Sequence, residues 1–377
     1  MLVVLAFLSF LGICGMTILF PLLAAVVRVP SSRCSARSSL PRNISILVPA
    51  HNEEALLPAT LFGMREAIQE TRKQWNCHFR ILVGADGCTD KTEQVAREMG
   101  IEVVSMSSKT GKWGTLSNLV THCAESEWTI LADCGVSWPR NFLTRLAPFL
   151  VKEDTIGVAP TYRNNTSGML EKLVWRMESV IKRIELRSGG PVSVHGATVC
   201  YRTKELASAL DFLSRRHWLN DDIVIPLALR ALYPTKRLVY VGSLAVTESP
   251  KPARYERSEF RRRRRLVVGN IQWIAFLWGP VWRYNSVAAI LACRRVFRLL
   301  WAYWAAFACL AVVFCLGIFS VSVPCIVGLT MVCMVAVVYD SQLKAVFESS
   351  LASILAPYYL LSTLLRPPIS SQETSWN

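Results

Sequence analysis

The longest uninterrupted hydrophobic stretch in the chain lies at its beginning. Residues 2–27, LVVLAFLSFLGICGMTILFPLLAAVV, contain no charged side chain. A helix of about 20 apolar residues crosses the hydrocarbon core of a bilayer, so this stretch is long enough to span a membrane. A cleavable signal peptide is the alternative, but such peptides have a basic first region and a shorter apolar core. We therefore predict an uncleaved transmembrane helix over 1–27.

Further apolar stretches lie near the other end of the chain, at residues 299–319 and 321–339. Their lengths again suit spanning helices. The stretch 351–365 is shorter, so it is either a further span or a helix in the membrane interface. The pattern predicts a C-terminal transmembrane region over 293–377.

Between these ends the pattern changes to short β-branched segments that alternate with segments of helical periodicity. The β-branched segments are 44–50, 79–86, 101–106 and 128–134. Such alternation is typical of an open, mostly parallel sheet flanked by helices. Ligands of these sheets bind beyond the carboxyl ends of the strands. We therefore predict an α/β domain over 28–292 whose ligand site lies at that edge of the sheet.

The formal net charge is +15, and much of the excess lies beside the apolar stretches. Arginines follow the first stretch and precede the second, at positions 28, 33, 37, 42, 294, 295 and 298. Positively charged flanks stay on the cytoplasmic side, which predicts a multi-pass inner-membrane protein with a cytoplasmic α/β domain. The run Arg261–Arg265, followed by Trp-rich apolar sequence, suits a helix at an anionic bilayer surface. This explains the charge better than nucleic-acid binding does.

Three side chains on the predicted ligand edge suit a phosphate-bearing ligand. Asp86 and Asp133 each end a predicted strand. A carboxylate there can hold Mg²⁺ or Mn²⁺, which bridge phosphates, although Asp also favours turns for local reasons. Lys112 lies between the glycines of GKWG and can reach a phosphate as a point charge. The spacing of this loop is not that of a Walker motif.

Two adjacent carboxylates, Asp221 and Asp222, stand at the start of the apolar segment IVIPLAL. They either begin a helix, whose first turn favours acidic residues, or one of them accepts a proton. A neighbouring negative charge raises the basicity of a carboxylate, which favours the second interpretation without excluding the first. His195, beside Gly196, is either a packing residue or a contact to a ligand.

Seven motifs come in the order found in family 2 glycosyltransferases of the GT-A fold. They are ILVPAHNEE, VGADGCTDKT, GKWGTLSN, ILADCGVSWP, HGATVCYR, NDDIVIP and RRRRRLVVGN. The chain resembles the membrane-anchored members that build polysaccharides or glycolipids, over residues 43–275. The resemblance implies the GT-A fold, Mg²⁺ or Mn²⁺ as cofactor, and a nucleotide-diphosphate sugar as donor, with uridine diphosphate the expected nucleotide.

The resemblance assigns donor-binding residues by their place in these motifs. Pro49, Ala50 and Glu53 match the first nucleotide loop, Asp86 the aspartate that contacts the base, Lys112 the Gly-Lys segment, and Asp133 the metal-holding last aspartate of Asp-x-Asp. Leu131 stands where the first aspartate of that motif would be, so a grip on the metal by both aspartates of the motif is not available.

The resemblance also assigns the residues nearest the reaction. Asp222 matches the general base, and Asp221 replaces the glutamate that precedes it. Arg263 and Arg265 match the arginines of the Gln-x-x-Arg-Trp element, which implies a role at the diphosphate or the acceptor, while Leu266 stands in place of its Trp.

Together these residues predict inverting transfer of a sugar to a hydroxyl of a growing polysaccharide or a lipid-linked glycan at the cytoplasmic membrane face. A hydroxyl is a poor nucleophile until a base removes its proton, and the departing diphosphate needs positive charge. A transferase that adds a single sugar to a lipid is the alternative among enzymes. A non-catalytic membrane protein that binds nucleotide sugar or anionic lipid is the alternative from another class.

Overall fold

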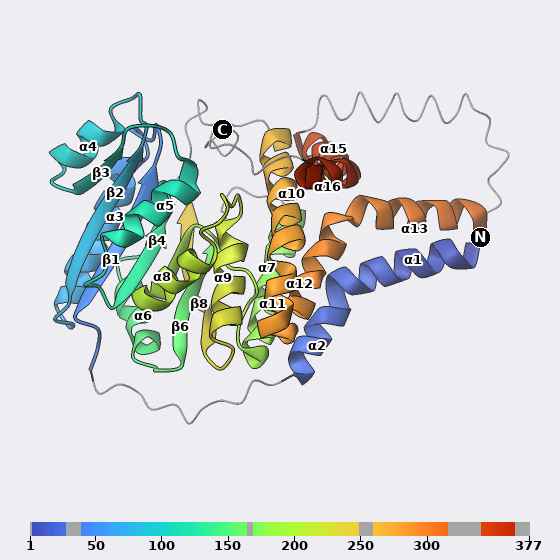
Figure 1. Cartoon of the computed structure of the whole chain (residues 1–377), viewed down its shortest axis with the longest axis horizontal. Coiled ribbons are helices and arrows are strands. Elements are labelled where there is room, and N and C mark those ends of the chain that lie inside the picture. Colours follow the sequence, from blue (N-terminus) through green and yellow to red (C-terminus); the bar gives the residue numbers. More distant parts are fainter. Residues whose placement is uncertain (1, 28–38, 164–168, 249–258, 316–340, 366–377) are drawn as a thin grey trace. The chain divides into compact units, whose positions relative to one another are not determined.

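The computed structural model describes residues 2–27, 39–163, 169–248, 259–315 and 341–365. The chain divides into two compact units, both drawn in Figure 1. The helical unit contains Met1–Leu23, Arg257–Gly279 and Ile290–Pro367, and the sheet unit contains Ala24–Glu256 and Pro280–Ala289. This division groups 257–279 with the terminal helices, whereas the sequence predicts them within the α/β domain over 28–292. The predicted domain boundaries stay a prediction.

A mixed sheet forms the centre of the sheet unit. Among the described residues it has eight strands, in the order β3-β2-β1-β4-β7-β6-β8-β5. They are β1 (Asn43–Ala50), β2 (His78–Asp86), β3 (Glu102–Met106), β4 (Trp128–Ala132), β5 (Val136–Ser137), β6 (Thr155–Arg163), β7 (Thr198–Arg202) and β8 (Arg237–Glu248). The predicted mixed α/β sheet with flanking helices is confirmed.

The first four strands, β3-β2-β1-β4, run parallel to one another. β7 is antiparallel to both β4 and β6, β6 and β8 are parallel, and β5 is antiparallel to β8. The chain therefore places the carboxyl ends of β1, β2 and β4 side by side at one edge of the sheet, where ligands of such folds bind.

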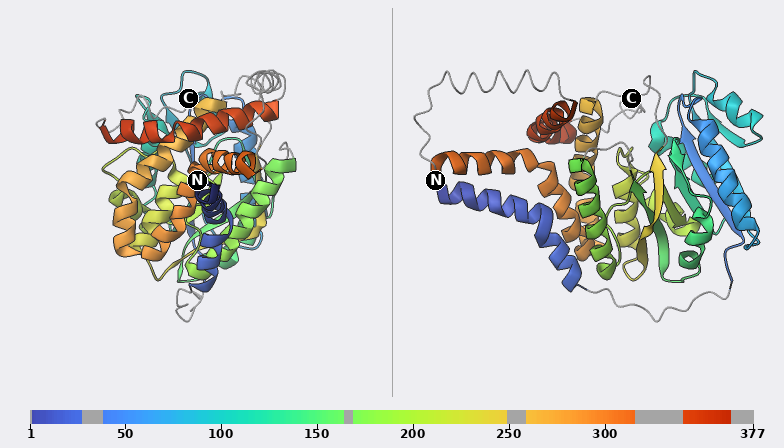
Figure 2. Two further views of the ribbon diagram at one scale, coloured as in Figure 1. Left: turned by 90° about the vertical axis from the view of Figure 1, so that its right-hand side faces the viewer. Right: turned by 180° about the vertical axis from the view of Figure 1, so that it is seen from behind.

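Helices cover both faces of this sheet. α5 (Gly111–Thr121), α8 (Thr203–Phe212) and α9 (Asp221–Leu232) lie on the near side in Figure 1, and α3 (Leu57–Arg72) comes to the front in the reverse view of Figure 2. α3 and α6 (Phe142–Leu150) pack on the alternate side chains of β1, Ile44, Ile46 and Val48. The remaining helical segments are α4 (Thr92–Glu98), α7 (Met169–Glu185) and a 3₁₀ turn, Leu186–Ser188.

Burial along β1 accounts for its mostly apolar sequence. Every residue from Ile44 to Ala50 is buried, as expected for a strand with helices on both faces. Gly84 of the neighbouring β2 allows α5 to approach closely, since a Cβ there would lie 2.5 Å from the Thr115 side chain. A larger residue at this position would push the helix away from the sheet.

The helical unit contains the apolar ends of the chain. α1 (Leu2–Cys14), a π-helical turn (Gly15–Leu19) and α2 (Phe20–Val26) follow one another without a break, although the last three residues of α2 belong to the sheet unit. The other helices of this unit are α10 (Glu259–Phe276), α13 (Trp301–Cys315), α15 (Ser341–Ile354) and α16 (Ala356–Leu365). α11 (Trp278–Tyr284) and α12 (Ser286–Leu299) contain residues of both units.

Small residues allow close helix contacts within the helical unit. A Cβ on Gly12 would lie 2.2 Å from the Trp304 ring, and one on Gly15 would lie 2.5 Å from the Phe297 ring. Glycine at helix contacts with bulky partners is typical of packing between apolar helices. α1 therefore packs closely on α13 at Gly12, and the π-helical turn packs closely on the end of α12 at Gly15.

One helical stretch among the described residues could cross a membrane by its length and composition. It is Val4–Val26, with 23 residues and a mean hydropathy of 2.2. The described part of the predicted span 299–319 lies on α13, which contains the apolar segment Trp301–Ala311, while 316–319 and 321–339 lie outside the described residues. α15 and α16, with 14 and 10 residues, are each shorter than the ~20 residues of a spanning helix. The described residues therefore support one candidate span and do not support a multi-pass arrangement.

Candidate active site

The ends of three parallel strands bring several predicted site residues to one edge of the sheet. Pro49 and Ala50 end β1, Asp86 ends β2, and Asp133 directly follows β4. Pro49 and Ala50 pair in register with Gly84 and Ala85 of β2, so the first nucleotide loop and the Asp86 turn start side by side.

Asp86 is fully buried and is bound to the start of α5. Its Oδ1 accepts hydrogen bonds from the Thr110 backbone N–H (2.6 Å) and hydroxyl (2.9 Å), and its Oδ2 accepts one from the Gly111 N–H (2.8 Å). A carboxylate at a helix N-terminus stabilises its unpaired N–H groups. Asp86 thus fixes the helix whose second residue is Lys112, and its predicted contact to a base stays a prediction.

The loops after β1 and β2 are held together by side-chain hydrogen bonds. The Glu53 backbone N–H donates to the Thr92 hydroxyl (2.7 Å), and the Glu54 N–H donates to Asp90 Oδ2 (3.1 Å). Asn52 adopts a positive φ of 55° and accepts a hydrogen bond from the Thr89 N–H (2.8 Å). Asn is one of the few residues that tolerate this conformation. These bonds hold the loop that contains Glu53 against the loop that follows β2.

Lys112 joins two carboxylates from different elements. Its Nζ lies 2.7 Å from Asp133 Oδ1 and 3.0 Å from Asp221 Oδ2. The side chains of Lys112 and Asp221 are 19 % and 15 % exposed, while that of Asp133 is 41 % exposed. The three residues come from the start of α5, the turn after β4 and the start of α9. The site is thus assembled from segments far apart in the sequence.

Electrostatics keep this lysine charged. Burial by itself lowers the pKa of the Lys112 ammonium, but the attraction of Asp133 and Asp221 outweighs burial and raises the pKa above its ordinary value. A protonated lysine between two carboxylates leaves one negative charge on the three groups. The ammonium therefore stays charged at any pH at which the protein would be assayed.

Asp222 lies beside this network. A Cβ built on Gly196 would lie 3.5 Å from the Asp222 Cβ and 3.8 Å from Lys112 Nζ. The Asp222 carbonyl accepts a hydrogen bond from the Val194 N–H (2.9 Å), which ties the start of α9 to the segment before β7. Burial, then the nearby Asp221 and Asp222, raise the pKa of the Tyr201 phenol well above its ordinary value. The two aspartates therefore face the same small region as Lys112.

Asp221 and Asp222 also occupy the first turn of α9, as the helix-start interpretation predicts. The cap position is Asn220, whose side chain makes no capping hydrogen bond. Acidic residues in a first turn are favoured by the helix dipole, so position alone accounts for their presence there. The ion pair of Asp221 with Lys112 goes beyond that account, because it joins α9 to another helix.

Arg263 and Arg265 belong to the other compact unit. Both lie on α10, in the helical unit. Their predicted role at the diphosphate or acceptor stays a prediction.

An aromatic cluster that the sequence did not single out surrounds His195. The ring centroid of His195 lies 5.0 Å from that of Trp175, 6.1 Å from that of Tyr240 and 6.2 Å from that of Tyr162. His195 is 7 % exposed. Packing accounts for its place, and the spacing of these residues along the chain gave no signal of the cluster.

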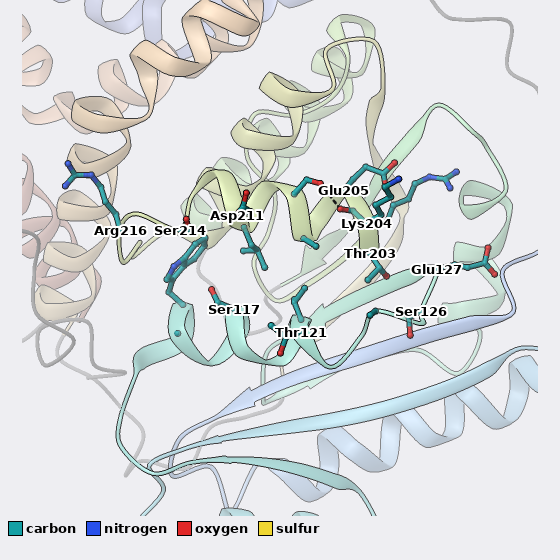
Figure 3. A pocket seen from close by; sticks show the side chains of 18 of the residues that line it. Ser117, Thr121, Ser126, Glu127, Thr203, Lys204, Glu205, Asp211, Ser214 and Arg216 are labelled. Carbon is teal, nitrogen blue, oxygen red and sulfur yellow. Dashed lines mark hydrogen bonds between the residues drawn. The ribbon is translucent and has the colours of Figure 1, made fainter.

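A groove of about 970 Å³ separates α5 from α8 (Figure 3). Its walls mix small apolar and polar side chains, including Ser117, Thr121, Asp211 and Ser214. None of the predicted site residues is among those that line it. We therefore locate the candidate site at the sheet edge and not in this groove.

The residues at the sheet edge fit a divalent cation in a limited way. Within the described part of the chain, no three His, Cys, Asp or Glu side chains gather as a metal site. Mg²⁺, however, is commonly held by one or two carboxylates together with substrate phosphates. Asp133, the more exposed partner of Lys112, can supply one such carboxylate. The site therefore fits a cation that the diphosphate of a ligand helps to hold.

Similarity to one solved structure supports the fold. The mannosyltransferase PcManGT from Pyrobaculum calidifontis, solved with GDP-mannose and Mn²⁺, is similar with a TM-score of 0.67 and 17 % identity, over 96 % of this chain and 99 % of that one. Glucosyl-3-phosphoglycerate synthase from Mycobacterium tuberculosis, solved with phosphoglyceric acid, gives a TM-score of 0.44 and 19 % identity, over 62 % of this chain and 79 % of that one. No curated protein matches the sequence.

A family model gives the sequence-level result. Residues 45–205 match the model described as glycosyl transferase family 2. The match begins in β1 and ends in α8, so it contains Asp86, Lys112 and Asp133 but stops before Asp221 and Asp222. Residues 45–205 of the chain are therefore similar to glycosyl transferase family 2, and the fold of the chain is that of a solved mannosyltransferase.

Proposed function

We propose that the chain transfers a sugar from a nucleotide-diphosphate donor to an acceptor hydroxyl, with inversion at the anomeric carbon. The observation that carries this proposal is the position of Asp222 beside the Lys112–Asp133–Asp221 network, at the ligand edge of a family 2 domain. A candidate base and a candidate binding site for a diphosphate are thereby side by side.

The proposed reaction divides the work between the two sides of the site. Asp222 accepts the proton of the acceptor hydroxyl while the oxygen attacks the anomeric carbon, and the bond to the donor diphosphate breaks with its electron pair staying on the phosphate. General-base help of this kind is typically worth 10²–10⁴-fold in rate. On the other side, Lys112 offers its ammonium to the departing diphosphate, as preorganised positive charge stabilises a developing negative one.

A divalent cation is part of this proposal. Asp133 would hold Mg²⁺ or Mn²⁺, which supplies further positive charge to the diphosphate. The mannosyltransferase of similar fold was solved with Mn²⁺, which supports the choice of cation. Pro49, Ala50, Glu53 and Asp86 stay the proposed contacts of the nucleotide, with Arg263 and Arg265 proposed for the diphosphate or acceptor.

The acceptor is proposed to be a growing polysaccharide or a lipid-linked glycan at the cytoplasmic face of the inner membrane. The candidate span Val4–Val26 and the +15 charge support a place at an anionic membrane surface. A transferase adding one sugar to a lipid is the second candidate, and the single described span favours it over a polymer-secreting channel.

The test is release of nucleotide diphosphate from a panel of nucleotide sugars by the purified full-length protein in detergent. The panel contains UDP-glucose, UDP-N-acetylglucosamine and GDP-mannose, the last because of the similar mannosyltransferase. We expect turnover of one donor, its loss in EDTA and its recovery with Mn²⁺ or Mg²⁺. Full turnover in EDTA would remove the cation from the proposal, and turnover of no donor would contradict the proposed reaction.

A further inference from the structure

One ammonium and two carboxylates share a single position at the sheet edge. Lys112 Nζ lies 2.7 Å from Asp133 Oδ1 and 3.0 Å from Asp221 Oδ2. Two negatively charged oxygens from different elements are thus directed at the same point. This arrangement resembles the carboxylate part of a hard-cation site, since such ions collect oxygen ligands, with the ammonium in the place of the ion.

The free energy of this ion-pair arrangement suits a lysine side chain that can change its anionic partner. Lys112 and Asp221 are mostly buried, and burying charges costs free energy that their attraction only partly returns, so their ion pair is weak evidence for a role in stability. Lysine is a compact charge on a flexible four-carbon stem, and it can turn from one anionic partner to another. A bound diphosphate would provide such a partner next to Asp133.

We propose that the Lys112 ammonium occupies a cation position between Asp133 and Asp221 in the donor-free protein. It excludes divalent cations from this position until a bound diphosphate attracts the ammonium away. The metal then enters together with the donor, and both carboxylates become available to it. Asp221, which replaces a glutamate of the family motif, thereby gains a role toward the cation. The inference rests on the proposed function in so far as the donor carries a diphosphate.

The test measures Mn²⁺ binding to the nucleotide-free protein by electron paramagnetic resonance of free Mn²⁺. Removing a unit charge from within about 4 Å of a divalent cation removes a strong repulsion. Lys112→Met should therefore bind Mn²⁺ at least about tenfold more tightly than the wild type. Lys73→Met is the matched control, because Lys73 forms an exposed ion pair with Glu70 (2.7 Å) away from the site, and it should bind Mn²⁺ as the wild type does.

Two further arms make the result specific. Lys112→Arg keeps the positive charge and should bind Mn²⁺ as weakly as the wild type. Adding GDP or UDP should tighten Mn²⁺ binding strongly in the wild type and much less in Lys112→Met, because the linkage between the two ligands runs partly through the displaced ammonium. Should Lys112→Met fail to fold by circular dichroism, Lys112→Gln takes its place.

Nucleotide-free Mn²⁺ affinity unchanged in Lys112→Met or Lys112→Gln would overturn the inference. So would Mn²⁺ binding to Lys112→Arg as tight as to Lys112→Met, because charge would then not be what excludes the metal. Neither measurement requires turnover, so this inference can fail while donor cleavage succeeds, and donor cleavage can fail while Mn²⁺ binding behaves as expected.

Discussion

Single residues at the sheet edge have roles that their sequence motifs describe only in part. Asp86 matches a nucleotide-contacting aspartate by motif, yet both of its carboxylate oxygens accept hydrogen bonds from Thr110 and Gly111 at the start of α5. The sequence could predict that an aspartate ends this strand. It could not predict the direction of the carboxylate, because the partners come from a loop more than twenty residues further along.

At this scale we predict a stability effect for Asp86→Asn. An amide can accept at one oxygen only, so one of the three buried hydrogen bonds loses its acceptor and the others lose their charge assistance. We expect the free energy of unfolding to fall by about 2–3 kcal/mol, from the typical cost of a broken charged hydrogen bond. Urea denaturation measures it, with Asp211→Asn, at an exposed position, as a control that should change little.

An Asp86→Asn protein as stable as the wild type would show that this carboxylate is not what holds the start of α5.

At the scale of elements, sequence patterns located the parallel half of the sheet. The predicted strands 44–50, 79–86, 101–106 and 128–134 correspond to β1, β2, β3 and β4. Their buried β-branched runs form a strong local signal because each is covered on both faces. The other half, β5 to β8, which mixes parallel and antiparallel pairings, was not predicted, since these pairings join distant segments and depend on register rather than on composition.

The assembly of the site shows the same limit. Lys112 and Asp221 were each singled out, but for separate roles, and no local pattern predicts their 3.0 Å contact. The predicted spans 299–319 and 321–339 rest on apolar length, and they stay a prediction because 316–340 lie outside the described residues. The stretch 351–365 falls on α15 and α16, which are each shorter than a spanning helix.

An element-scale prediction concerns α9, which bears Asp222. Its buried Arg230 donates from Nη1 to the Gly190 carbonyl (2.6 Å) and from Nη2 to the Ser188 carbonyl (2.5 Å). Burial lowers the pKa of this guanidinium to about 10, against the attraction of Glu185. Arg230→Met would leave both carbonyls without these donors, so we expect a loss of about 3 kcal/mol in the free energy of unfolding.

Urea denaturation again provides the measurement for Arg230. Arg97→Met is the control, because Arg97 forms an exposed ion pair with Glu93 (2.6 Å), and such pairs contribute at most about 1 kcal/mol. Equal effects of the two substitutions would contradict the role of Arg230 in anchoring α9.

For the whole molecule, the predicted orientation places the sheet unit in the cytoplasm. The reason is the arginine-rich flank after the candidate span Val4–Val26, because positively charged flanks stay on the cytoplasmic side of a membrane. Burial raises the pKa of the Cys88 thiol, which makes it a slow reporter. An exposed Glu98→Cys on α4 is a better one: a membrane-impermeant maleimide should label it in opened cells and leave it unlabelled in intact ones.

Labelling of Glu98→Cys in intact cells, above that of the unmodified chain, would reverse the proposed orientation. Recovery of the full-length protein in the soluble fraction after cell breakage would instead contradict a membrane anchor at Val4–Val26.

The central claim is that the Asp222 carboxylate acts as the base of a sugar transfer at this sheet edge. Asp222→Asn keeps the shape and removes the basicity, and Asp221→Asn is the matched neighbour. The most direct measurement is nucleotide-diphosphate release from the active donor, with nucleotide affinity measured on the same proteins. We predict that Asp222→Asn loses about 10²–10⁴-fold in rate with its nucleotide affinity retained, and that Asp221→Asn loses less. Wild-type turnover by Asp222→Asn, or inactivation by Asp221→Asn alone, would contradict the account.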